Sequence, residues 1–307
     1  MKIYYSLENF PVLNCPVLTL GTFDGVHIGH QKILSRLNDM AKSVNGESVL
    51  MTFHPHPRAV IFPDQRDIRM ISTLDEKIAL LEQHGVEHLV VQSFTRDFSM
   101  LNHDTFIREY LVKKIGVKKM VIGYDHQFGH DRKGSFAELQ SLAPRLGFTV
   151  EEIPEQDIND VAVSSTRIRK ALFEGRVEDA AGLLGYNYTF SGRVVKGKQL
   201  GRKLGFPTAN LECPDPLKLV PANGVYAVYV IVNNVQYKGV LSIGTRPTFD
   251  NGARSVEVNI FDFDRDIYGE NVKLIFKNYL RSDQKFDGVD ALIEQMHLDK
   301  ASSLELL

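Results

Sequence analysis

Short apolar runs and segments with helical spacing alternate along the first half of the chain. The apolar runs predict strands at Val17–Leu20, Ser48–Phe53, Val86–Val91, Val117–Ile122 and Phe148–Ile153. The segments with helical spacing predict helices at about Gly29–Ala41, Asp75–His84, Thr105–Lys114, Ser135–Leu146 and Ser165–Glu174. Repeated strand–helix units predict a mostly parallel sheet with helices on both faces. Ligands of such folds bind at the carboxyl ends of the strands.

The pattern changes near Leu184, after which strand-length apolar runs follow one another without long helices between them. These runs predict strands at Tyr188–Val195, Gly224–Val232, Tyr237–Ile243, Ser255–Phe261 and Val272–Leu280. Asn233-Asn234 between two of these runs indicates a hairpin turn. The last segment, at about Val289–His297, is predicted to form a closing helix. Such a pattern is typical of a small antiparallel barrel or sandwich. We therefore predict two domains, residues 1–184 and 185–307, with the boundary in Gly182–Tyr186.

Composition narrows the function classes. The chain has 307 residues, which fits two domains, and a net charge of -2. That charge speaks against bulk electrostatic binding of nucleic acid but leaves room for a local phosphate pocket. Cys15 and Cys213 are too few and too far apart for a disulfide framework or a zinc site. Because no apolar run reaches signal-peptide or membrane-spanning length, we expect a cytoplasmic protein with no membrane partner.

A glycine-rich turn with two histidines follows the first of these strands. Residues 21–30 read Gly-Thr-Phe-Asp-Gly-Val-His-Ile-Gly-His. His27 and His30 are three residues apart at a helix start, so both can face one side of it. Unpaired N–H groups and the positive end of the helix dipole attract anions there, and the turn glycines let a ligand approach the backbone. This arrangement predicts a polyphosphate site in which both imidazoles donate to phosphate oxygens.

Three further polar segments lie after strands or at a helix start. Residues 163–169 read Val-Ser-Ser-Thr-Arg-Ile-Arg, a capped helix start whose last arginine is the better placed to face phosphates. Residues 53–57 read Phe-His-Pro-His-Pro and predict a stiff, extended loop. In residues 122–129, Asp125 is a candidate partner for a heterocycle or a ribityl hydroxyl. Taken alone, each segment is also explained by an ordinary cap or turn.

The second half carries another constellation. Residues 201–211 place two glycines and two cations before an extended Pro-Thr-Ala-Asn-Leu segment, which suits a phosphate chain. Thr208 and Asn210 share one face of a strand and offer the hard oxygen ligands that Mg²⁺ prefers. Glu257 points away from its apolar neighbours Val256 and Val258, and a carboxylate on a rigid strand is a candidate general base. Singly, Thr208 with Asn210 and Glu257 are more typical of solvated strand positions.

The segments of the first half resemble the HIGH-type nucleotidyltransferase superfamily. Residues 53–57 and 122–134 narrow the resemblance to the FMN adenylyltransferase module of bacterial bifunctional riboflavin kinase/FAD synthetases. It implies a Rossmann-like parallel α/β domain. The residues that it implies in ATP binding and activation are His27, His30, Ser164, Ser165, Thr166 and Arg169, with Gly21, Phe23, Asp24 and Gly29 around the nucleotide. His56 and Asp125 are implied on the flavin side. The sequence departs from the family pattern at His126 and Gln127.

The segments of the second half resemble the riboflavin kinase module of the same family, a β-barrel. The resemblance implies Mg²⁺–ATP at Thr208 and Asn210, with Glu257 as the base that activates the riboflavin 5′-hydroxyl. The residues implied in binding the ATP phosphates and the flavin are Gly201, Arg202, Gly205, Pro207, Arg281 and Phe286. Asn259 and Ser242 stand where the family pattern predicts His and Asn.

The resemblance covers nearly the whole chain, in order, across two unrelated folds. It predicts an enzyme that converts riboflavin and ATP to FMN and ADP, and then FMN and ATP to FAD and diphosphate. Its expected ligands are riboflavin, FMN, FAD, ATP and Mg²⁺, without nucleic acid, and its oligomeric state stays open. Two alternatives remain at this point: a chain that keeps kinase activity alone, and a tRNA-synthetase-like RNA-binding protein.

Overall fold

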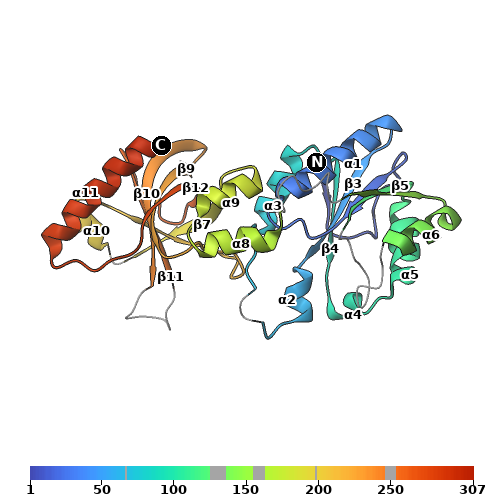
Figure 1. Cartoon of the computed structure of the whole chain (residues 1–307), viewed down its shortest axis with the longest axis horizontal. Helices are drawn as coiled ribbons and strands as arrows, with labels where there is room; N and C mark the ends of the chain where they lie inside the picture. The colour runs from blue at the N-terminus through green and yellow to red at the C-terminus, as the bar shows by residue number, and fades with distance from the viewer. Residues whose placement is uncertain (66–67, 125–135, 155–162, 198, 246–253) are drawn as a thin grey trace. The chain divides into compact units, whose positions relative to one another are not determined.

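The computed structural model describes residues 1–65, 68–124, 136–154, 163–197, 199–245 and 254–307. The chain divides into two compact units, Met1–Ser164 and Ser165–Leu307 (Figure 1). The first unit is built on a parallel sheet and the second on a closed barrel.

Six parallel strands form the sheet of the first unit, in the order β1-β4-β3-β2-β5-β6. They are β1 (Lys2–Tyr4), β2 (Val17–Leu20), β3 (Ser48–His54), β4 (His88–Ser93), β5 (Lys119–Gly123) and β6 (Thr149–Ile153). The sheet and its parallel order confirm the prediction. The sequence did not indicate β1, a three-residue edge strand with two exposed positions and no apolar run.

Helices cover both faces of this sheet. They are α1 (Ile28–Ser43), α2 (Pro57–Ile61), α3 (Leu74–Gln83), α4 (Arg96–Ser99), α5 (His103–Thr105), the π-helix η1 (Phe106–Ile115) and α6 (Phe136–Leu146). Leu50 of β3 packs in one core with residues of α1 and α3, whereas its neighbours Val49 and Met51 pack in the other with η1 and α6. Strands buried on both faces read as continuous apolar runs, which explains the pattern in the sequence. The single helix predicted over 105–114 is instead α5 followed by η1.

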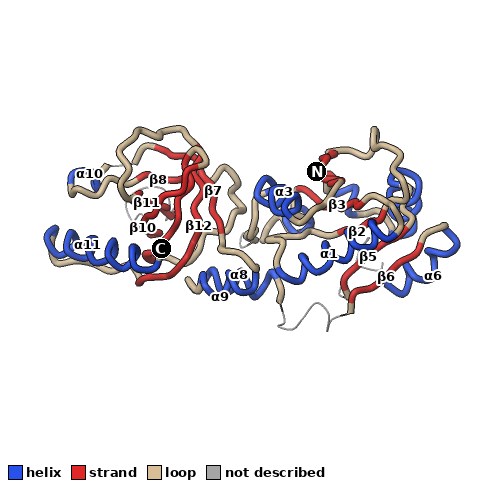
Figure 2. Tube along the Cα trace, turned by 90° about the horizontal axis from the view of Figure 1, so that it is seen from above, coloured by secondary structure: helices blue, strands red, loops and turns tan. Residues whose placement is uncertain are grey.

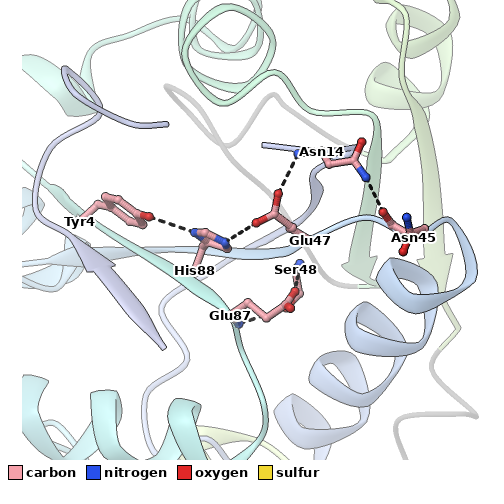
Figure 3. A network of polar contacts seen from close by, with 7 residues as sticks. All are labelled: Tyr4, Asn14, Asn45, Glu47, Ser48, Glu87 and His88. Carbon is pink, nitrogen blue, oxygen red and sulfur yellow. Dashed lines mark hydrogen bonds and ion pairs between the residues drawn. The ribbon is translucent and has the colours of Figure 1, made fainter. Parts of the chain in front are cut away.

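The polar side chains at the amino ends of β3 and β4 join the strands at the edge opposite the carboxyl ends (Figure 3). Buried His88 contacts Glu47 through Nε2 at 2.9 Å and the Tyr4 hydroxyl through Nδ1 at 3.1 Å. Glu47 also accepts the backbone N–H of Asn14 at 2.8 Å, and this hydrogen bond is the main cause that lowers the pKa of its carboxyl. These contacts fix the register of the strands at the edge away from the predicted site.

In the second unit, two helices precede a closed six-stranded barrel with the order β10-β11-β8-β7-β12-β9. Helices α8 (Ser165–Phe173) and α9 (Val177–Leu184) precede the barrel, whereas α10 (Leu200–Lys203) lies between β7 and β8, and α11 (Val289–Leu306) follows β12. The strands are β7 (Thr189–Val195), β8 (Ala209–Glu212), β9 (Gly224–Val232), β10 (Val235–Thr245), β11 (Arg254–Ile260) and β12 (Asn271–Arg281). All six pairings are antiparallel, so the fold is the barrel rather than the sandwich.

The hairpin turn and the closing helix that the sequence predicts are both present in this unit. Asn233 and Asn234 take the left-handed conformation, with φ of 49° and 63°, in the predicted hairpin between β9 and β10. The closing helix α11 runs to Leu306, beyond the predicted end, and packs against β9, β10 and β12 (Figure 2). Helix α9 was not predicted. It ends at Gly185, whose φ of 80° suits glycine at a helix C-terminus.

Candidate active sites

The turn between β2 and α1 has an unusual backbone. Phe23 and Val26 have positive φ values of 47° and 38°, which side chains other than glycine rarely adopt. Gly25 has a φ of 81°, and a Cβ on it would lie 2.8 Å from Cγ2 of Ile71. Such conformations persist only where surrounding contacts hold them, and they gather at functional sites.

His27 caps helix α1 with its own side chain. Its Nδ1 accepts the backbone N–H of His30 at 3.3 Å. An imidazole that accepts through Nδ1 carries its proton on Nε2, so the cap selects the neutral Nε2–H tautomer. The rings of His27 and His30 stack with centroids 3.7 Å apart and an interplanar angle of 15°. The structure thus confirms that both histidines face the same side at the helix start.

His30 is held neutral by its surroundings. Its pKa lies well below the usual value, first because of burial and then because of electrostatic interactions with His27 and Lys77. The ring of Phe23 lies 4.8 Å from that of His30. Among the residues that the structure describes, His30 Nδ1 is buried without a hydrogen-bond partner. A buried imidazole without a partner is a candidate for an interaction that only a ligand supplies.

Asp24, one of the residues implied in ATP binding, is buried beneath the turn. Its carboxylate accepts the backbone N–H groups of Ile71 and Ser72 at 3.0 and 3.1 Å. The hydroxyl of Ser72 also donates to Asp24 at 3.4 Å and accepts the N–H of Gly25 at 3.1 Å. Asp24 therefore ties the turn to the segment that leads into α3. Whether it also contacts a nucleotide stays a prediction.

Lys77 of α3 is a polar residue of this site that the sequence analysis missed. It is 6% exposed, and its Nζ donates to the carbonyl oxygen of Thr22 at 2.8 Å. The hydroxyl of buried Thr52 donates to the same carbonyl at 3.2 Å. A signal existed in the sequence, because Lys77 falls within the stripe of Leu74, Ile78 and Leu81 that the helical spacing turns toward the core.

The remaining predicted residues of the first site lie in three places. Gly21 follows β2, and its N–H donates to Met51 at 3.0 Å, while Gly29 is buried in the first turn of α1. The extended loop predicted over 53–57 is shorter, because β3 continues to His54 and Pro57 opens α2, which His56 caps. Asp125, like His126 and Gln127, lies outside the described residues.

The segment implied in ATP activation falls at the division between the two units. Ser164 ends the first unit, whereas Ser165 opens α8 in the second. Ser164 and Thr166 are exposed, and Arg169 is partly exposed. The predicted convergence of these residues with His27 and His30 stays a prediction.

In the barrel, strand register brings the predicted base beside a predicted metal ligand. Glu257 of β11 lies directly opposite Asn210 of β8 and opposite Ser242 of β10. Directly opposed residues share one face, with Cβ atoms about 4.5–5.5 Å apart. Val256 and Val258 are buried, as the alternation predicted, so Glu257 points to the other face.

The chain packs closely around Asn210 and Thr208. A Cβ on Gly197 would lie 2.3 Å from Nδ2 of Asn210, and one on Gly201 would lie 2.3 Å from the carbonyl oxygen of Phe206. Asn259 donates through Nδ2 to the carbonyl of Pro207 at 2.7 Å, so this departure from the family pattern holds the Pro-Thr-Ala-Asn motif in place. The Phe206 N–H donates to the carbonyl oxygen of Gly201 at 2.9 Å, which forms a turn between these two residues. Arg202 and Gly205 within this turn are exposed.

Arg281 and Phe286, implied in flavin binding, lie together. The Arg281 guanidinium is 5.7 Å from the Phe286 ring centroid. It also makes a bidentate ion pair with Asp299 of α11, with N–O distances of 2.8 and 2.7 Å. Gln295 donates to the same carboxylate at 2.9 Å. The terminal helix thus orients this arginine.

Two absences concern the described part of the chain. None of its helices combines the length and apolar character needed to cross a membrane. Nor do its histidine, cysteine, aspartate and glutamate side chains gather in threes as a metal site. Mg²⁺ bound mainly through substrate phosphates needs no such cluster.

The fold and these side chains define a two-module protein. A parallel α/β unit presents stacked imidazoles at a helix start, and a closed barrel presents a carboxylate beside an amide. The first module has the parallel α/β fold that the resemblance implies for a nucleotidyltransferase, and the second has the barrel that it implies for a riboflavin kinase.

Comparisons with known proteins agree with this division. The family model described as FAD synthetase matches residues 12–167, and the one described as riboflavin kinase matches residues 184–307. Residues 168–183 lie between them, and the predicted boundary at 184–185 stays a prediction. The bifunctional riboflavin kinase/FMN adenylyltransferase of Bacillus subtilis is 39% identical over 94% of this chain and 91% of its own. That of Escherichia coli K12 is 35% identical over 98% and 95%.

A solved structure also shares the architecture. The crystal structure of a macrolide-efflux protein from Streptococcus pneumoniae superposes with a TM-score of 0.88 and 34% identity, over 98% of this chain and 97% of that one. The name of that protein differs from the descriptions of both family models, each of which matches one module of this chain. The chain belongs to the family of bifunctional riboflavin kinase/FMN adenylyltransferases. The presence of both modules supports two activities over the kinase-only and RNA-binding alternatives.

Proposed function

We propose that each module of this chain carries out one of the two reactions at the site described above. The barrel transfers the terminal phosphoryl group of ATP to riboflavin, which gives FMN and ADP. The α/β unit then joins FMN to the AMP part of ATP, which gives FAD and diphosphate. The observation that carries this proposal is the pair of separate polar constellations, His27/His30 and Glu257/Asn210, each inside its own family match.

The adenylyl transfer needs no covalent enzyme intermediate. An oxygen of the FMN phosphate attacks the α-phosphorus of ATP, and diphosphate leaves from the opposite side. Catalysis therefore rests on positioning and on neutralising the charge that develops on the phosphate oxygens. His27 and His30 donate to these oxygens at the start of α1, where the backbone N–H groups add to the attraction. A phosphate beside His30 stabilises its protonated form and so opposes the burial that lowers its pKa.

Other residues complete this proposed site. Gly21 and Gly29 leave room for the nucleotide, and Phe23 and Asp24 hold the turn around it. We assign further ATP contacts to the hydroxyl and guanidinium groups that the resemblance implies, namely Ser164, Ser165, Thr166 and Arg169. His56 and Asp125 are assigned to the flavin side.

In the barrel, Glu257 accepts the proton of the riboflavin 5′-hydroxyl as that oxygen attacks the γ-phosphorus. Thr208 and Asn210 would hold Mg²⁺ together with the ATP phosphates, because hydroxyl and amide oxygens suit this ion. When bound, the ion supplies charge neutralisation of the phosphates. Gly201, Arg202, Gly205 and Pro207 line the phosphate chain, and Arg281 with Phe286 takes the flavin.

The test is the flavin product profile with Mg²⁺ and ATP, from riboflavin alone and from FMN alone. The wild-type chain makes FMN and FAD from riboflavin, and FAD from FMN. Glu257→Gln lowers FMN formation by about 10²–10⁴-fold, because the amide cannot take a proton, while FAD formation from supplied FMN stays unchanged. Glu294→Gln on α11, where the carboxylate is exposed, is the control and changes neither reaction. No new flavin from the wild-type chain, or loss of both steps in Glu257→Gln, contradicts the proposal.

A further inference from the structure

The turn that carries the two histidines is bound on both sides by one other segment of the chain. On one side Asp24 accepts the N–H groups of Ile71 and Ser72. On the other side Lys77, six residues after Ile71, donates to the carbonyl of Thr22 at 2.8 Å. The segment 71–77 therefore determines where the turn lies relative to the sheet.

The start of α3 makes this support rigid. Thr73 caps the helix by accepting the N–H of Glu76 at 3.2 Å, and Glu76 accepts the N–H of Thr73 at 3.0 Å. This capping box fixes the first turn of the helix, from which the side chain of Lys77 extends. A lysine side chain has considerable rotational freedom, and burial against Thr22 and Thr52 removes it.

A buried ammonium group costs free energy unless its surroundings compensate for it. Burial lowers the pKa of Lys77, and the charge of Asp24 acts in the opposite direction. Packing alone does not explain a cation here, since an apolar side chain of similar length would fill the same space without that cost. The position of the charge points to electrostatics: Lys77 is one of the cations that disfavour protonation of His30.

We propose that Lys77 is a positioning residue for adenylyl transfer, which fixes the Thr22 carbonyl in the turn that carries the stacked imidazoles of His27 and His30. The inference rests on the proposed function of this site, and it names a residue outside the motifs that define the site. Within the part of the chain that the structure describes, the charged and titratable groups that bear on His30 are His27 at the start of α1 and Lys77 on α3, with Asp24 of the turn acting on Lys77.

Lys77→Met tests the proposal because methionine is unbranched and apolar, so it keeps most of the packing and removes the charge and the donors. Adenylylation of FMN should fall by about 10–100-fold, mainly in kcat, because a small displacement of a catalytic group has effects of this size. Riboflavin phosphorylation by the same chain is the internal control and should not change. The NMR signal of the His30 ring is assigned by its loss in His30→Asn. Its pH titration should give a higher pKa for His30 in Lys77→Met than in the wild type.

Two further variants separate charge from packing. Lys42→Met removes an exposed lysine in the last turn of α1 and should leave both the rate and the His30 pKa unchanged. Lys77→Arg keeps the positive charge, so the His30 pKa should stay low even where the altered shape slows the reaction. An unchanged rate and pKa in Lys77→Met, or an equal rise of the pKa in Lys77→Arg, overturns the inference. Absence of FAD synthesis in the wild type would instead contradict the proposed function, because the titration does not depend on turnover.

Discussion

The two modules hold the side chains that we propose to act on ATP by different means. In the α/β unit the histidines follow a turn outside the sheet, and this turn is fixed by buried polar contacts from Asp24 and Lys77. In the barrel, Glu257 and Asn210 lie on adjacent strands, and the strand ladder itself sets their spacing. The first arrangement depends on a few buried polar groups, whereas the second depends on register and on close packing around one amide.

The largest expected effect tests whether the two modules are stable independently. Leu50 of β3 and Leu274 of β12 are both fully buried, each in the core of its own unit. Replacing a buried leucine with alanine costs about 2–5 kcal/mol. Leu50→Ala should therefore lower the temperature at which FAD synthesis is lost, and Leu274→Ala the temperature at which kinase activity is lost. Residual activities after stepped heating measure both, and a joint loss in either variant would contradict independent stability.

A smaller change tests the close packing of the barrel site. Gly197→Ala places a methyl group where Nδ2 of Asn210 now lies 2.3 Å away, so the amide must move. We expect riboflavin phosphorylation to fall by about tenfold or more, with FAD synthesis from FMN unchanged. Gly182→Ala in α9 is the matched control, because nothing lies within 4 Å of its Cβ position. An unaltered rate of riboflavin phosphorylation in Gly197→Ala would show that the reaction does not depend on the present position of the Asn210 amide.

The smallest expected effect concerns the support of the histidine turn. Thr73→Ala removes the cap of α3, which costs about 1 kcal/mol. Thermal unfolding of the first unit should shift down by about 2–4 °C, and hydrogen exchange in the first turn of α3 should speed up. Thr73→Ser keeps the hydroxyl and should behave like the wild type. An effect on the barrel of equal size would argue against the division of roles between the modules.

Much of the fold was predictable because it follows from local patterns. Buried strands such as β3 read as continuous apolar runs, and Asn233-Asn234 provides the left-handed residues that a tight hairpin needs. The elements that were missed lack such a signal. Edge strand β1 has no apolar run, and the π-helical hydrogen bonding of η1 leaves no trace in residue spacing.

The sequence by itself determined the two modules, the strand–helix order and the placement of both histidines on one side of a helix start, because periodicity and a three-residue spacing act over one or two turns of chain. Only the tertiary structure decided that Lys77 donates to Thr22, that Asp24 binds the segment before α3, and that Glu257 lies opposite Asn210. Each of these contacts joins residues separated by about fifty positions in the chain. Their formation depends on how helices pack on the sheet and how strands pair, which no local pattern specifies.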